Sequence, residues 1–127
     1  MPKILNIVET AYRATLEEQD DTILWLTHML KNAGADISIL LKSNAVNYAV
    51  KGQDASGLTF GELKMSNPPE IDKDLEKMVA KGVLVYLLKE DAAERGVSST
   101  ELIAGIREVT RKELPELFDQ HDHVWHW

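Results

Sequence analysis

The stretch "VYLLKEDAAERGVSS" (Val85–Ser99) decides the fold predicted for this chain. It starts as an unbroken apolar run and turns polar at Lys89. It then reaches a helix start at Ser98, which Glu101 follows three residues later as in a capping box. An apolar run without polar alternation is typical of a strand that is covered on both faces. We therefore expect a buried strand, a polar loop and a helix, which together form the repeating unit of an α/β protein.

The same apolar character marks further strands along the chain. "KILNIVE" (3–9), "ADISILL" (35–41) and "GVLVYLL" (82–88) are the clearest, "HVWHW" (123–127) is weaker, and "GIREVT" (105–110) is a fifth with few strand formers. Helical spacing and capping signals lie between them, at 15–34, 43–52, 67–82, 98–105 and 114–120. This alternation predicts one domain over residues 1–127: a three-layer α/β/α fold with a mostly parallel, five-stranded, flavodoxin-like sheet.

The composition excludes several functional classes. The 127 residues carry a net charge of −7, whereas sequence-independent nucleic-acid binding needs a basic face. The chain contains no cysteine, so disulfides, thiolate metal sites and a cysteine nucleophile are impossible. No apolar run approaches the ~18 residues of a membrane span, and the first residues turn polar too soon for a signal peptide. We expect a cytoplasmic protein without a cofactor and without nucleic-acid or membrane partners.

Segment 53–66, "QDASGLTFGELKMS", is the one long stretch without a predicted element. Loops of this length in a compact domain are usually functional or mobile. Leu58, Phe60, Leu63 and Met65 make it apolar, which favours packing against another subunit.

Ligands of open parallel sheets bind beyond the carboxyl ends of the strands, where the strand order reverses. Three loops qualify: "ETAYRAT" (9–15), "LKSNA" (41–45) and "LLKEDAAERG" (87–96). The first has no glycine, so it cannot wrap a pyrophosphate as a Gly-rich loop does. Leu87 and Leu88 stand where a phospho-receiver would need an aspartate. A nucleotide site and a receiver site are therefore both disfavoured.

The polar and aromatic side chains of these loops have two interpretations. In the first, Glu90 or Asp91 caps the turn that follows, with Gly96 supplying the positive φ that ends it. Alternatively, a pocket forms in which a basic side chain meets a small anion or an acidic group of a partner. The residues predicted to line that pocket are Tyr12, Arg13, Lys42, Asn44, Leu88, Lys89, Glu90, Asp91 and Arg95.

The C-terminal "HDHVWHW" gathers three of the four histidines. On a strand, His121 and His123 would share one face and His126 would lie on the other. Two imidazoles without a third ligand make a poor zinc site, so His121 and His123 are only weak metal candidates. The preferred interpretation is an edge strand or a subunit contact anchored by Trp125 and Trp127, with Phe60 as a further interface residue.

The order of these segments resembles the DsrE/DsrF-like family, including its TusD and YchN branches. The resemblance covers nearly the whole chain, through "KILNIVETAY", "LLKSNAVNYAVKGQ", "GVLVYLLKEDAAERGVSSTELIAGI" and "FDQHDHVWHW", with "AERGVSSTEL" the most specific part. It implies a small α/β/α protein that forms homo- or hetero-oligomers, often trimers or hexamers. Several members accept persulfide sulfur in cytoplasmic sulfur relays, on a cysteine in the loop after the third strand.

Counted back from Arg95 and Gly96, the family's cysteine position falls on Leu88, and the second cysteine of some members falls on Asp91. Neither residue can hold sulfane sulfur, which requires a thiolate. The resemblance thus predicts a non-catalytic homo-oligomer that binds or assembles with a sulfur-relay protein. The alternative is an enzyme, or a protein that binds a metal or a small anion, which uses the polar loop after the third strand.

Overall fold

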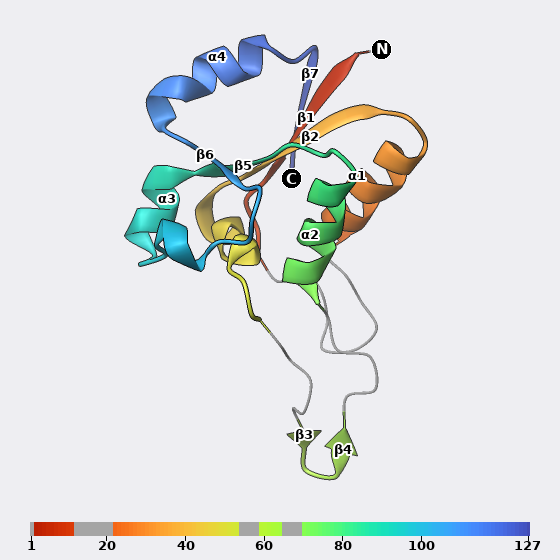
Figure 1. Ribbon diagram of the computed structural model, residues 1–127, viewed down its shortest axis with the longest axis vertical. Helices are drawn as coiled ribbons and strands as arrows, with labels where there is room; N and C mark the ends of the chain where they lie inside the picture. Colours follow the sequence, from red (N-terminus) through yellow and green to blue (C-terminus); the bar gives the residue numbers. More distant parts are fainter. Residues whose placement is uncertain (1, 12–21, 54–58, 65–69) are drawn as a thin grey trace.

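A computed structural model describes residues 2–11, 22–53, 59–64 and 70–127 of the chain. Its centre is a five-stranded sheet in the order β6-β5-β2-β1-β7, and every pairing in this sheet is parallel (Figure 1). The strands are β1 (Lys3–Val8), β2 (Asp36–Leu41), β5 (Val85–Leu88), β6 (Arg107–Val109) and β7 (His123–His126). All five predicted strands are present, including the doubtful one within 105–110, and the predicted parallel sheet is confirmed.

Helices cover both faces of the sheet, as predicted (Figure 1). One face packs against α1 and α2 through a core that includes Ile39, Leu75 and Met78, and the other packs against α4 through Leu5 and Leu117. The α-helices of the described residues are α1 (Thr22–Asn32), α2 (Ile71–Ala80), α3 (Lys89–Glu94) and α4 (Leu114–Asp119). Three 3₁₀-helices complete the layers: η1 (Ser43–Ala49), η2 (Ser99–Glu101) and η3 (Arg111–Glu113).

Three local predictions were wrong. The helix predicted at 98–105 is only the three-residue 3₁₀-helix η2. Helix α3 begins directly after β5, so the predicted polar loop is a short helix that ends before Gly96, whose φ of +69° matches the predicted stop. Segment 43–49 is a 3₁₀-helix and not an α-helix. Ser43 is the first residue of this 3₁₀-helix, and its φ of +51° is uncommon for a residue with a side chain.

Part of segment 53–66 has structure that the sequence did not predict. A two-stranded hairpin of β3 (Thr59–Phe60) and β4 (Leu63–Lys64) turns at Gly61 and lies far from the main sheet (Figure 1). Phe60 and Leu63 are exposed in it. Several predicted features, namely the start of the first helix, the cap before α2, Leu58 and Met65, lie outside the described residues.

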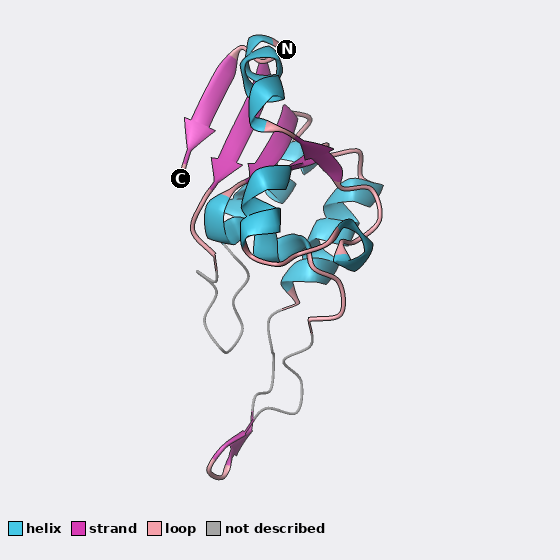
Figure 2. Ribbon diagram, turned by 90° about the vertical axis from the view of Figure 1, so that its left-hand side faces the viewer, coloured by secondary structure: helices cyan, strands magenta, loops and turns pink. Residues whose placement is uncertain are grey.

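The C-terminus lies at the end of the edge strand β7 (Figure 2). Within the described part of the chain, none of the helices has the length and apolar character needed to cross a bilayer.

Candidate functional site

Polar side chains gather beyond the carboxyl ends of the strands, as the topology requires. The larger group is centred on Asp91 in α3, whose side chain is buried. The Ser43 N–H donates to Asp91 Oδ2 over 2.6 Å, and Arg111 Nη2 donates to Asp91 Oδ1 over 3.0 Å. Both carboxylate oxygens are therefore engaged, and they join the segments that follow β2, β5 and β6.

The contacts of Asp91 explain two local features. A buried carboxylate aimed at the Ser43 N–H stabilises the start of η1, where Ser43 has a left-handed backbone. The hydrogen bond to Asp91 also raises the pKa of Arg111, although the Arg111 side chain is 56% exposed. This exposure means that the guanidinium group remains open to solvent on one side.

Arg95 and Glu90 extend the same group. Arg95 Nε donates to Asn44 Oδ1 over 3.0 Å, and Arg95 Nη1 donates to the Asp91 carbonyl over 3.1 Å. The Glu90 carboxylate accepts the Arg111 N–H at 3.1 and 3.0 Å. Glu90 and Asp91 thus cap the segments that begin at residues 111 and 43. The prediction that they cap their own turn was wrong, because the tertiary fold brings other orphan N–H groups closer.

Leu88, at the family's cysteine position, is only 3% exposed and ends β5 beside Val109 of β6. Within the described part of the chain it is a buried residue of the core. Lys89, the next residue, is exposed.

A second polar group surrounds Glu9, which follows β1. Lys42 Nζ lies 2.8 Å from Glu9 Oε1, and His126 Nε2 lies 3.0 Å from Glu9 Oε2. The hydrogen bond from Lys42 is the largest influence and lowers the pKa of Glu9; partial burial opposes it, and His126 adds to it. Lys42 was predicted to face the same pocket as Arg95, but its charge is directed to Glu9.

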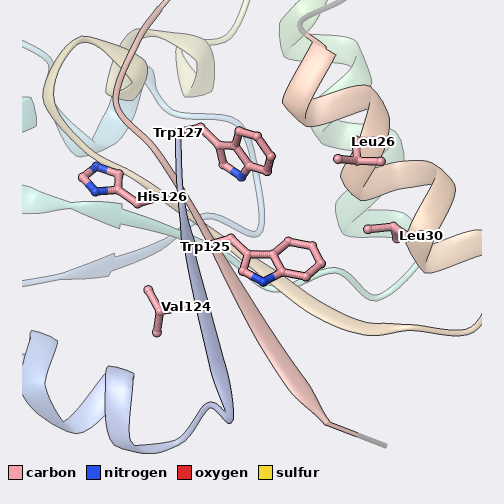
Figure 3. A pocket seen from close by; sticks show the side chains of 6 residues that line it. All are labelled: Leu26, Leu30, Val124, Trp125, His126 and Trp127. Atoms are coloured by element: carbon pink, nitrogen blue, oxygen red, sulfur yellow. The ribbon is translucent and has the colours of Figure 1, made fainter.

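An apolar groove of about 650 Å³ lies between α1 and β7 (Figure 3). Trp125 and Trp127 lie on the side of β7 that faces α1, and Val124 and His126 lie on the other side (Figure 3). The groove is lined by Leu26, Leu30, Val124, Trp125, His126 and Trp127.

A chain of hydrogen bonds ties this strand to the core. The indole of Trp127 donates to Asn6 Oδ1 over 3.1 Å, and Asn6 Nδ2 donates to Thr27 Oγ1 over 2.8 Å. Thr27 in turn donates to the Ile23 carbonyl over 2.8 Å. Asn6 is fully buried, and these partners satisfy both ends of its amide.

The C-terminal histidines do not share one strand face. His121 precedes β7, and its Nδ1 lies 2.8 Å from the Leu117 carbonyl at the end of α4. His123 is in the strand and His126 contacts Glu9. Among the described residues, no three or more histidine, cysteine, aspartate or glutamate side chains lie together in a way that could bind a metal ion.

Some predicted pocket residues come together and others do not. Asn44, Glu90, Asp91 and Arg95 meet in one group, whereas Tyr12 and Arg13 lie outside the described residues. Sequence reasoning missed Ser43, Arg111 and Glu9 as site residues. Glu9 could have been predicted as a site residue, because it is the first polar residue after β1. Arg111 could not, because it follows a strand with few strand-forming residues.

The fold and site define a class: single-domain α/β proteins with a parallel sheet and a polar group at its carboxyl edge.

The crystal structure of the YchN protein from E. coli matches the whole of both chains, with a TM-score of 0.76 and 26% sequence identity. The structure of MTH1491 from Methanobacterium thermoautotrophicum, a protein of unknown function, matches 96% of each chain with a TM-score of 0.55 and 16% identity, which shows the fold alone. The likeness to YchN agrees with the resemblance to the DsrE/YchN-related family that the sequence motifs indicated. No protein-family model and no curated protein sequence matches it.

Proposed function

We propose that this chain is a non-catalytic DsrE-like protein, an oligomeric component that binds or assembles with partners of an intracellular sulfur relay. The likeness to YchN over the whole chain supports the fold-level relation, and the motif resemblance links that relation to sulfur transfer. Without a thiol the chain cannot carry sulfur as a persulfide, so its role would be recognition.

The surroundings of Leu88 and Asp91 carry this proposal. At the first cysteine position a leucine is packed in the interior, and at the second both oxygens of a carboxylate serve as acceptors for Ser43 and Arg111. A residue that holds three segments together is not free to act as a nucleophile or a general base. The site thus keeps the family's scaffold and uses the reactive positions for stability.

A sulfur-retention assay tests this proposal. The purified protein is incubated with inorganic polysulfide, gel-filtered and weighed by intact mass spectrometry. We expect no added sulfur on the natural chain. Leu63→Cys provides a matched positive control, because position 63 is 71% exposed and a thiol there would retain sulfur. Added sulfur on the natural chain would contradict the proposal.

Oligomer formation is the second part of the proposal. The exposed Phe60, Trp125 and Trp127 are the interface residues predicted from the sequence, and exposed aromatic anchors favour association. We expect a trimer or hexamer in the cytoplasm. Light scattering at micromolar concentration would reveal it, and a monomer would contradict it. Affinity co-purification from the native cell would identify the relay partner.

The alternative of an enzyme or a small-anion site has less support. Arg95 and Arg111 both contact Asp91, and both donate to oxygen atoms of neighbouring residues. An anion would have to compete with Asp91 and with Glu94, which lies 3.6 Å from Arg111.

A further inference from the structure

Strand β7 is an edge strand with one open side. Its inner side pairs with β1: the Trp127 N–H donates to the Ile7 carbonyl over 3.0 Å, and the Trp127 carbonyl accepts the Glu9 N–H over 3.3 Å. Backbone groups alternate in direction along a strand, so Trp125 also faces β1, whereas Val124 and His126 direct their N–H and C=O groups outward. In the described part of the chain no strand lies on that outer side.

The sequence of this edge lacks two common protections against pairing with another strand. Natural edge strands are usually protected by lysine, proline, a bulge or a covering loop, and residues 123–127 contain neither lysine nor proline. The neighbouring surface is apolar as well, because Trp125 and Trp127 are 36% and 41% exposed and border the groove beside α1. Trp25 and Met29, one helical turn apart on α1, are exposed too. An apolar surface of this kind beside an open edge marks a protein interface.

We propose that β7 pairs antiparallel with β7 of a second copy of this chain, around a two-fold axis that passes through Trp125. This inference rests on the hexamer of the proposed function and names its two-fold interface, since a closed trimer has no two-fold axis. The register follows from the alternation. The outward-facing Val124 would exchange both hydrogen bonds with His126 of the second copy, and the reverse pair would do the same. The two Trp125 residues would then face each other as a pair without mutual backbone hydrogen bonds.

Charge and symmetry favour a second copy as the occupant. The chain has a net charge of −7, yet residues 123–127 contain no carboxylate and no lysine or arginine, so self-pairing brings no like charges together along the strand. A two-fold axis perpendicular to the sheet also keeps both α1 helices on the same face. The two grooves would therefore join across the axis, and the indoles of each copy would help to cover those of the other.

Cysteine cross-linking tests the register directly, because the natural chain has no cysteine to react. In Trp125→Cys the two thiols would meet at the axis, where Cα atoms about 4.5 Å apart suit a disulfide. In Val124→Cys the thiols would lie on diagonal positions about 7–8 Å apart. Under mild oxidation we expect covalent dimer at least about fivefold faster for Trp125→Cys than for Val124→Cys. Glu76→Cys, an exposed thiol on α2 outside every expected interface, measures random collision. Equal rates for all three variants would overturn the inference.

A backbone pair of variants gives a second test on the full chain. Val124→Pro removes an outward N–H that β1 does not use, and Val124→Thr keeps it. By sedimentation we expect a natural hexamer that Val124→Pro divides into trimers, while Val124→Thr keeps the natural mass. A natural trimer would overturn this interface. The urea midpoint of each variant checks that the subunit is folded. An oligomer that Val124→Pro leaves intact would overturn this interface alone, whereas a monomeric natural protein would overturn the proposed oligomer as well.

Discussion

Asp91 and Glu9 lie at the same edge of the sheet, and each carboxylate contacts a basic side chain. Asp91 is 6% exposed and binds the backbone of one distant segment and the side chain of another, whereas the side chain of Glu9 is 36% exposed and contacts Lys42 and His126. Burial makes a satisfied carboxylate costly to remove, and exposure makes it nearly dispensable. The two groups therefore have different roles despite similar chemistry.

This difference shows where the molecule has capacity to bind. Around Asp91 the described polar groups form hydrogen bonds with one another, which supports the proposed scaffold role. Beside Glu9, by contrast, β7 leaves indoles exposed and backbone groups directed outward. Recognition surfaces of the protein are thus expected at the β7 edge and the hairpin more than at the family's reactive loop.

Replacing Asp91 gives the largest effect expected from this comparison. Asp91→Ala leaves the Ser43 N–H without its acceptor and should lower the free energy of unfolding by about 2–3 kcal/mol. The loss stays below that of a fully buried ion pair because Arg111 can turn to solvent. Urea denaturation measures it. Glu94→Ala removes an exposed carboxylate near the same arginine and should change stability by less than about 0.5 kcal/mol. Equal losses for both variants would break the distinction between buried and exposed carboxylates.

The link between β7 and the core should have an intermediate effect. Asn6→Ala removes the acceptor of the Trp127 indole and a donor to Thr27, and should cost about 1–2 kcal/mol. A double-mutant cycle with Thr27→Ala sharpens the test, because two residues that share a hydrogen bond should lose less together than the sum of the single losses. Strict additivity would mean that the Asn6–Thr27 contact contributes nothing.

Glu9 should show the smallest effect, with a defined pH dependence. Because its pKa is lowered from 4.5 in the folded protein, its contribution is present above that value and is lost as the pH falls through the folded-state pKa. Glu9→Gln should therefore cost less than about 1 kcal/mol at pH 7, and the difference from the natural chain should vanish in acid. Thermal unfolding of both proteins between pH 3 and pH 7 measures it, the range following from the ordinary carboxyl pKa. A difference that grows in acid would contradict the assigned contacts.

Local patterns predicted most of the fold. Long apolar runs correctly predicted strands β1, β2 and β5. The capping box predicted at Ser98 and Glu101 is present in the structure. The hairpin of β3 and β4 escaped prediction because two-residue strands carry no periodicity. Helix α3 was not predicted because charged residues such as Lys89 and Glu90, directly after an apolar strand, are typical of a loop.

The site was predicted less well. The sequence pointed to the loop that contains Glu90 and Asp91, but not to Ser43 or Arg111 as their partners, which lie 48 and 20 residues from Asp91. A hydrogen bond between such distant residues depends on how strands are ordered in the sheet. No local pattern carries that information.

The amino-acid sequence by itself determined that the sheet is buried on both faces and that no residue can carry a persulfide, because side-chain polarity and the presence of a thiol are properties of individual residues. Only the tertiary structure decided that Leu88 is packed inside, that Asp91 binds two distant segments, and that β7 is left at an open edge. Strand order sets these outcomes, since it determines which groups lose contact with water and which partners they meet there.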